Sequence, residues 1–267
     1  MPIEWLLYPL LGIVAGLLAG LLGVGGGLVL VAALALLLPA QGVAPEAAMH
    51  AALATSLASV VVTACASAYA HHRRGSVLWA SVAWLLPGLL LGGWMGSFIA
   101  KGIRGESLRW LVVAYCVLAA AQLLLDLPRR RAEAAGMDAA VPRGLGMSVA
   151  GVGIGMVSAL VGIGGGSMTV PLLVWRGVPP VRAVGSSSAC GVAIGLSAAA
   201  GYASGGAVAG MPAGSIGFVF LPAAIGIAIT SLAMAPVGAA LAHRISPLAL
   251  KRIFAGFLLA MAALLAS

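Results

Sequence analysis

Two glycine motifs inside apolar runs carry the clearest chemical signal in this sequence. Residues 23–27 read GVGGG and residues 162–166 read GIGGG. Each glycine weakens a helix by roughly 1 kcal/mol relative to alanine, so both motifs predict a break in a helix. The glycines could simply allow two helices to pack closely, or a short helix that starts after the break could offer free N–H groups and its positive dipole end to an anion. The candidate donors are Gly25, Gly26, Gly27, Gly164, Gly165, Gly166 and Ser167.

A group of hydroxyl side chains follows each glycine motif. The first lies in HAALATS (residues 50–56) and the second in RAVGSSS (residues 182–188). A hydroxyl can donate a hydrogen bond to an oxyanion without placing a charge in apolar surroundings. It can equally bond to the carbonyl one turn back in its own helix, and the sequence leaves both roles open. We call these side chains the hydroxyl cluster: Thr55, Ser56, Ser186, Ser187 and Ser188.

The acidic residues are informative through their positions. All lie at chain ends or in predicted loops, so no carboxylate is embedded in an apolar run to relay protons or to bind a metal ion. This pattern argues against a cation pump and a metal transporter, and we expect no metal, no cofactor and no nucleic-acid partner. Without a buried cluster of His, Asp and Glu or a nucleophile beside a base, we also expect that the chain is not an enzyme. The six acids are Glu4, Glu46, Glu106, Asp126, Glu133 and Asp138.

The composition places the elements that carry these residues in a membrane. Hydrophobic residues make up 62% of the 267 residues and charged residues only 7%, where a soluble domain has roughly a quarter charged residues. The apolar runs reach about 20 residues without strict alternation, which indicates spanning helices rather than a β-barrel. The sequence therefore predicts an all-α polytopic membrane protein. Pro87 and Pro222 predict kinks within two of its helices.

The chain divides into two similar halves of four apolar regions each. The glycine motif, the hydroxyl cluster and a closing pattern (GSFIAKGI at 96–103, GAALAHRI at 238–245) occur in the same order in both. We expect a first membrane repeat at 1–126, a linker at 127–143 and a second membrane repeat at 144–267. In each repeat the first apolar helix is broken by glycines. Such duplication is typical of secondary transporters.

The distribution of Lys and Arg tests how the halves are oriented. If every apolar region crosses once, eight basic residues lie on one side of the membrane and six on the other, which is no bias. If the region at 144–175 enters and returns on the same side, the count becomes eleven against three, as the positive-inside rule expects. The flanks of the first region are uncharged, but the repeat predicts that it folds back in the same way. Each half then crosses three times, so the halves are inverted, with both termini outside and the linker in the cytoplasm. Parallel halves with broken helices that cross remain the alternative.

His50 and Arg182 occupy equivalent positions, each at the start of a hydroxyl-bearing helix. Arg182 could attract an anion, or its side chain could extend to the membrane surface. His50 can change charge near neutral pH and could couple transport to protons. We treat both as candidate entrance or coupling residues.

The residues resemble the sulfite exporter TauE/SafE family, also called the toluene sulfonate uptake permease family. The similarity rests on GLLGVGGGLVLV (residues 20–31) and LVGIGGGSMTVPLL (residues 160–173), each followed by a small-residue helix with ATS or SSS, and it covers nearly the whole chain except the linker. The two halves differ at one equivalent position after the motifs, where the second has Pro171 and the first has Ala32. The first break could be less rigid for this reason, so the two breaks need not have equal roles. The resemblance implies a permease of the plasma (inner) membrane for sulfur-containing anions such as sulfite, sulfonates or sulfoacetate.

These observations together predict a secondary transporter that works by alternating access between the halves. A passive anion channel would share the same features and is the alternative. The expected partners are a small anionic substrate, the lipid bilayer and a coupling proton or sodium ion. Small-residue surfaces such as residues 88–96 could pack within one chain or in a homodimer.

Overall fold

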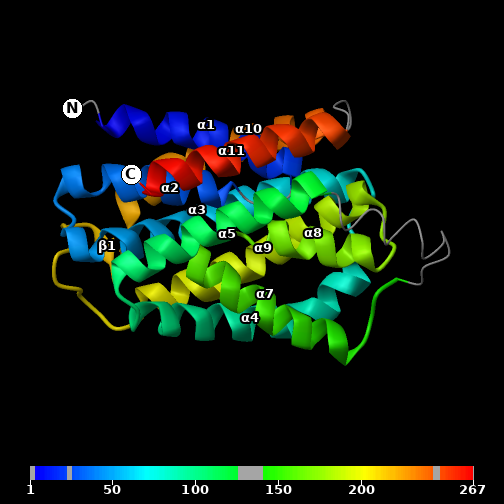
Figure 1. Ribbon diagram of the computed structural model, residues 1–267, viewed down its shortest axis with the longest axis horizontal. Helices are drawn as coiled ribbons and strands as arrows, with labels where there is room; N and C mark the ends of the chain where they lie inside the picture. Colours follow the sequence, from blue (N-terminus) through cyan, green and yellow to red (C-terminus); the bar gives the residue numbers. More distant parts are fainter. Residues whose placement is uncertain (1–3, 23–25, 126–140, 243–246, 267) are drawn as a thin grey trace.

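The computed structural model describes residues 4–22, 26–125, 141–242 and 247–266. Helices dominate this part of the chain, and the predicted all-α class is confirmed (Figure 1). A short antiparallel hairpin pairs β1 (Ser215–Ile216) with β2 (Val219–Phe220). The helices, in chain order, are α1 (Glu4–Leu22), α2 (Gly27–Leu37), η1 (Pro39–Gln41), α3 (Pro45–Arg73), α4 (Trp79–Lys101), α5 (Gly105–Leu125), α7 (Leu145–Val161), α8 (Gly166–Trp175), α9 (Pro180–Ala203), α10 (Leu221–Ala242) and α11 (Pro247–Ala266).

Both glycine-containing apolar regions are broken, as predicted. The first forms α1 and α2, and the second forms α7 and α8. The residue before each short helix is a glycine with positive φ, Gly26 at 67° and Gly165 at 73°. This left-handed conformation costs a residue with a β-carbon energy, which explains the requirement for glycine at the start of both helices.

The hydroxyl-bearing helices α3 and α9 lie in the centre of the bundle. Four helices in the described part of the chain are long and apolar enough to cross a membrane: α3, α4, α9 and α10. The most apolar windows of α3 and α9 are 78% and 72% buried, against 44% and 33% for α4 and α10. The outer helices expose apolar side chains such as Leu91 and Ile229, as expected for surfaces in contact with lipid. The chain is thus built as a multi-pass membrane protein.

The second broken segment starts and finishes at the same end of the bundle (Figure 1). Just ahead of α7, the Pro142 carbonyl accepts a hydrogen bond from Ser81, which lies at the start of α4 (2.9 Å). The end of α8 leads directly into α9, where Ser186 accepts a hydrogen bond from the Leu78 N–H in front of α4 (2.9 Å). Both ends of the segment therefore lie where α4 begins.

The first broken segment returns to the opposite end in the same way. Helix α1 starts beside the start of α10, where a β-carbon on Gly226 would lie 3.0 Å from the Tyr8 β-carbon. Helix α2 leads into α3, whose first turns contact the end of α4 through a hydrogen bond from His50 to the Ala100 carbonyl (3.1 Å). Each broken segment thus folds back. The side of the membrane on which each end lies, and the inverted relation of the halves, stay predictions.

Helices from different halves pack through close glycine contacts. A β-carbon on Gly16 of α1 would lie 2.7 Å from the Ser231 carbonyl oxygen of α10. A β-carbon on Gly155 of α7 would lie 2.6 Å from the Leu89 carbonyl oxygen of α4. Gly16 and Gly155 are separated by the same offset as the two glycine motifs, so the contacts correspond to each other under the predicted duplication. Small residues allow this approach because no side chain holds the backbones apart.

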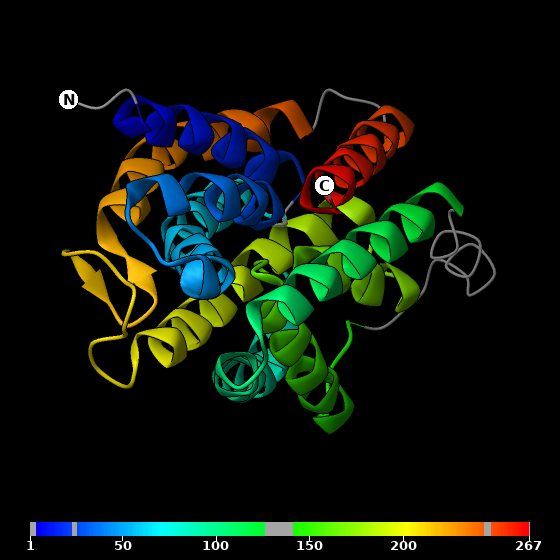
Figure 2. The ribbon, with the colours of Figure 1, turned by 60° about the vertical axis from the view of Figure 1, so that its left-hand side comes forward.

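The glycine face of α4 packs within the chain. A β-carbon on Gly92 would lie 2.1 Å from the Val152 carbonyl oxygen of α7, and one on Gly88 would lie 1.9 Å from the Ser148 carbonyl oxygen. Gly88, Gly92 and Gly96 of the surface at residues 88–96 therefore pack against α7 within the chain, while its larger side chains, such as Leu91, are exposed, and a homodimer stays a prediction (Figure 2).

Two details differ from the sequence prediction. Pro222 is the second residue of α10 and not an interior kink, because residues 214–220 form turns and the hairpin before the helix starts. Pro in the first turn is tolerated, since the N–H that it lacks would have no helical partner there. Pro87 does lie inside α4. Residues 127–140 of the predicted linker lie outside the described residues, and the domain boundaries stay predictions.

Candidate functional site

The second glycine break is buried inside the protein. Gly162 ends α7 with φ 77°, and the N–H groups of Gly162 and Ile163 both bond to the Ser158 carbonyl (2.8 and 3.0 Å). Residues 161–166 are all buried. A break in a membrane-spanning region must be enclosed in this way or line a polar cavity, because lipid offers no hydrogen-bond partners to the backbone.

The N-terminus of α8 offers unpaired backbone donors at this break. The N–H groups of Met168 and Thr169 bond to the Gly165 carbonyl (3.1 and 2.8 Å). Among the described residues, the four preceding N–H groups have no hydrogen-bond acceptor. These groups mark the positive end of the helix dipole, which favours an anion. They belong to Gly164, Gly165, Gly166 and Ser167, as the sequence predicted for a helix that starts here.

Hydroxyls that the sequence analysis did not single out flank the same break. Ser158 and Thr169 are fully buried, and their side-chain oxygens have no hydrogen-bond partner among the described residues. An ideal β-carbon on Gly165 would lie 3.3 Å from Ser158 Oγ, so this hydroxyl lies directly against the break. The Ser167 hydroxyl pairs with the hydroxyl of Tyr115 on α5. Single hydroxyls in apolar helices are common, which is why neither Ser158 nor Thr169 attracts attention before the fold is known.

The short helix after the first break starts at the same left-handed glycine conformation, but its own first turns are apolar. The first six residues of α2, Gly27 to Ala32, are buried and carry no polar side chain. By the offset that aligns the two glycine motifs, Ala19, Leu28 and Leu30 stand where the second half has Ser158, Ser167 and Thr169. Gly25, the remaining predicted donor, lies outside the described residues.

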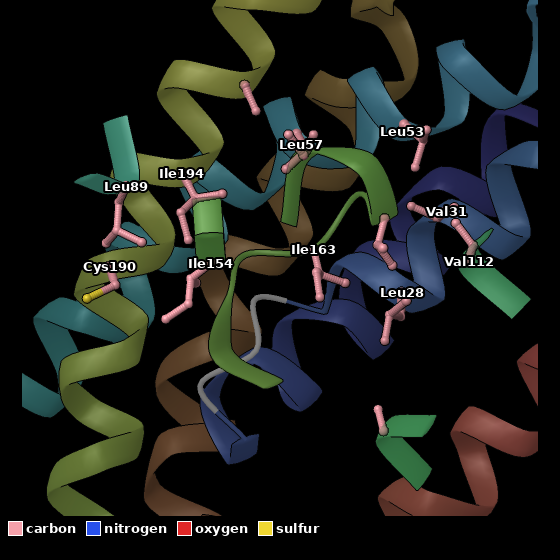
Figure 3. Packing of buried hydrophobic residues seen from close by; sticks show 14 of the residues in the cluster. Leu28, Val31, Leu53, Leu57, Leu89, Val112, Ile154, Ile163, Cys190 and Ile194 are labelled. Carbon is pink, nitrogen blue, oxygen red and sulfur yellow. The ribbon is translucent and has the colours of Figure 1, made fainter. Parts of the chain in front are cut away.

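The two breaks touch each other in the bundle. A β-carbon on Gly27 would lie 2.5 Å from the Gly162 carbonyl oxygen. Ser56 Oγ of α3 lies 3.0 Å from both the Gly27 and the Gly162 carbonyl oxygens and can donate its proton to either. Figure 3 shows Leu28 and Val31 of α2 close to Ile163 in the second break. The structure thus brings Ser56 to the breaks, where it bonds to the backbone.

Other members of the hydroxyl cluster bond across the two halves. Thr55 Oγ1 accepts a hydrogen bond from the Phe220 N–H, directly before α10 (3.0 Å). Ser186 Oγ accepts one from the Leu78 N–H, directly before α4 (2.9 Å), and donates to the Arg182 carbonyl (2.7 Å). Each therefore satisfies an N–H group at the start of a long helix in the opposite half.

The remaining serines bond one turn back in α9, which is the second role that the sequence left open. The hydroxyls of Ser187 and Ser188 both donate towards the Val184 carbonyl (2.9 and 3.1 Å), and Ser188 Oγ also lies 3.0 Å from Ser67 Oγ. Whether any of these hydroxyls also contacts an anion stays a prediction.

His50 and Arg182 lie at opposite ends of the bundle, at the starts of α3 and α9. The His50 ring is buried, its Nε2–H points to the Ala100 and Ile103 carbonyls (3.1 and 3.0 Å), and it stacks on Phe218. Because both partners are acceptors, Nε2 carries the hydrogen. Arg182 is exposed. Neither side chain contacts the breaks, and their roles stay predictions.

Within the described ranges, no group of three or more His, Cys, Asp or Glu side chains is placed to hold a metal ion. The polar groups at the breaks are amides and hydroxyls. Such groups donate hydrogen bonds to oxyanions without carrying charge.

Comparison with known proteins connects this geometry to one family. The family model described as sulfite exporter TauE/SafE matches residues 8–265. A probable membrane transporter protein of Haemophilus influenzae is 36% identical over 259 residues, which cover 96% of each chain. A probable membrane transporter protein of Xylella fastidiosa is 37% identical over 72% of this chain and 71% of its own.

A more distant relative, the probable membrane transporter protein YunE of Bacillus subtilis, is 28% identical over 66% of this chain and 70% of its own. No solved structure was found to match. The family match spans α1 to α11 and includes both glycine breaks. The chain therefore belongs to the sulfite exporter TauE/SafE family of membrane proteins.

Proposed function

We propose that this protein is a secondary transporter that moves a small sulfur-containing anion, such as sulfite, a sulfonate or sulfoacetate, across the membrane by alternating access. The family description and the relatives named as membrane transporters support the transporter role. The main observation in favour of an anionic substrate is the buried N-terminus of α8, where consecutive N–H groups lack acceptors within the described chain. An anion at this position would receive those donors and the helix dipole.

We place the proposed substrate site where the two breaks meet. They lie in contact, each folds back from a different end of the bundle, and Ser56 links their carbonyls. Substrate sites of transporters built from repeats commonly lie where broken helices of the two halves meet. We assign the backbone groups of residues 25–27 and 164–167 to this site, and we assign the hydroxyl cluster to contacting the anion, with Ser56 also holding the two breaks together.

The remaining assignments follow the charge pattern. We propose the inner membrane as location, with both termini outside and the linker in the cytoplasm. A reporter fused to the C-terminus tests this arrangement, and a cytoplasmic signal would contradict it. His50 and Arg182 are assigned to the two entrances, with a proton or sodium ion as coupling ion.

Transport in proteoliposomes tests the central proposal. We expect uptake of radiolabelled sulfite or sulfoacetate that saturates with concentration and is accelerated by the same anion trapped inside. Flux that rises without saturation and shows no such acceleration would favour the passive anion channel. Absence of any flux for sulfite, sulfoacetate, taurine and sulfate would contradict a sulfur-anion transporter.

A further inference from the structure

Two buried hydroxyls lie beside the N-terminus of α8. Ser158 Oγ and Thr169 Oγ1 are enclosed, and neither finds an acceptor or donor among the described residues. A buried hydroxyl without a partner destabilises a protein, because it has lost its hydrogen bonds to water. Two such groups at one helix start indicate that the site is completed by something that the polypeptide does not supply.

The side chains approach the break from its two sides. Ser158 is in the last turn of α7, next to Gly165. Thr169 is in the first turn of α8, and side chains on a helix lean toward its N-terminus, which places the Thr169 hydroxyl towards the same break. The free N–H groups of residues 164–167 lie between the two hydroxyls in sequence.

We propose that Ser158 and Thr169 are substrate-binding residues that, with the α8 N-terminus, form one oxyanion site in the second half of the protein. This inference rests on the proposed transport function and restricts the substrate to a narrower class of anion. Donors on both sides of a glycine turn suit a ligand with several acceptor oxygens in different directions, such as the pyramidal SO₃ group of sulfite or a sulfonate. A chloride ion offers one acceptor atom and cannot use the separated donors equally well.

The site holds the anion without a cationic side chain. The polar side chains at this break, Ser158, Ser167, Thr169 and Tyr115, are all hydroxyls. Hydrogen bonds from uncharged groups bind an anion without a buried counter-ion, whose desolvation would be costly. Such a site suits a substrate that must also be released.

Two conservative substitutions separate a binding role from a structural one. Purified protein in detergent is titrated with sodium sulfite, sodium methanesulfonate and sodium chloride, and the dissociation constant and the unliganded melting temperature are recorded. We expect Ser158→Ala and Thr169→Val each to weaken sulfite or methanesulfonate binding about tenfold, as loss of one hydrogen bond to a charged group predicts. Thr169→Ser, which keeps the hydroxyl, should bind like the wild type.

The unliganded melting temperature gives the second readout. Because the hydroxyls have no partner in the protein, their removal should leave this temperature unchanged or raise it. Ser197→Ala is the matched control, because its buried hydroxyl bonds to the Ile194 carbonyl of its own helix (3.2 Å). This control should leave the anion affinity unchanged.

Each outcome separates the two proposals. Wild-type affinity in both Ser158→Ala and Thr169→Val, whether or not their melting temperatures fall, would overturn this inference and leave the transport proposal intact. If the wild type itself binds neither sulfite nor methanesulfonate, the proposed anionic substrate fails, and this inference fails with it. Chloride binding as tight as sulfite binding would overturn the assignment to an SO₃ group.

Discussion

The two glycine breaks share a backbone conformation and differ in chemistry. Gly26 and Gly165 have φ of 67° and 73°, and each begins a short helix inside the bundle. Ser158, Ser167 and Thr169 lie around the second break, and Ala19, Leu28 and Leu30 occupy the corresponding positions at the first. A repeated backbone conformation therefore need not carry repeated chemistry: the second break has two buried hydroxyls without partners among the described residues, whereas Ser56, the hydroxyl at the first break, bonds to the backbone.

Contacts elsewhere in the two halves are more alike. The hydroxyl of Tyr202 donates to the Ala159 carbonyl in α7, and Nε2 of His71 lies 3.2 Å from the Gly20 carbonyl in α1. Gly20 and Ala159 correspond by the offset of the glycine motifs. If His71 and Tyr202 correspond to each other as well, their offset is one residue shorter than that in the alignment of HAALATS with RAVGSSS. The contacts then pair Thr55 with Ser186, whereas that alignment pairs Thr55 with Ser187. The predicted duplication accounts for both pairs of contacts.

The largest effect on stability is expected from substitution of the glycines that precede the two short helices. A β-carbon on Gly26 would lie 2.4 Å from the Ala15 carbonyl oxygen, whereas the nearest atom for Gly165 is the flexible end of Ile194. We expect Gly26→Ala to lower the free energy of unfolding by at least about 2 kcal/mol, and more than Gly165→Ala does. Denaturation with SDS measures both values.

Gly153→Ala is the control for these glycine variants, because a β-carbon at this helical position meets no atom within 4 Å. It should be neutral or stabilising. A loss in Gly165→Ala as large as that in Gly26→Ala would show that the two breaks are packed equally tightly, against the comparison.

The next effect concerns the link between the breaks. Ser56→Ala removes the hydroxyl that lies 3.0 Å from the carbonyls of Gly27 and Gly162. We expect a loss of about 1–3 kcal/mol in unfolding free energy, since buried carbonyls lose their donor. Ser197→Ala, whose hydroxyl bonds within its own helix, should lose less. Equal losses would contradict a linking role for Ser56.

A smaller effect tests whether the halves are equivalent outside the breaks. Thr55→Val and Ser186→Ala each remove the acceptor of an N–H group in front of a long helix. A hydrogen bond of this kind contributes about 1 kcal/mol, so the two variants should be destabilised by similar amounts. The same SDS denaturation provides the comparison. A loss confined to one variant would show that these contacts have diverged as the breaks have.

The smallest effect on stability is expected at an exposed entrance. Arg182→Gln should change the free energy of unfolding by less than about 0.5 kcal/mol, because this side chain is exposed. If Arg182 attracts the anion, uptake at low ionic strength should fall and the difference should vanish at high salt. Uptake that is unchanged at every ionic strength would contradict the entrance role.

Much of the fold could be predicted from the sequence because its signals are local. Apolar length predicts membrane helices, and consecutive glycines predict where two of them break. Ser56 was predicted as a candidate anion contact, but its position between the carbonyls of the two breaks was not predicted. The bonds of Thr55 and Ser186 could not be predicted either, because their partners Phe220 and Leu78 are brought close only by packing between halves.

Dependence on packing also explains why two candidate substrate-binding residues could not be predicted from the sequence. Ser158 and Thr169 are separate hydroxyls in apolar helices, and sequence spacing alone gives them no common target. Only the turn at residues 162–165 brings α7 and α8 to one point. The departure that the sequence did reveal, Pro171 in place of Ala32, pointed to unequal breaks without indicating which chemistry differs.

The most direct test of the unequal breaks is to locate a bound anion. Crystals of the protein soaked in sodium selenite, which has the pyramidal geometry of sulfite, would give an anomalous selenium signal. We predict one peak at the N-terminus of α8, within hydrogen-bond distance of the Gly166 N–H and Ser158 Oγ. A peak bound by the N-terminus of α2 alone, or no peak at α8 when selenite binding is saturated, would contradict the account.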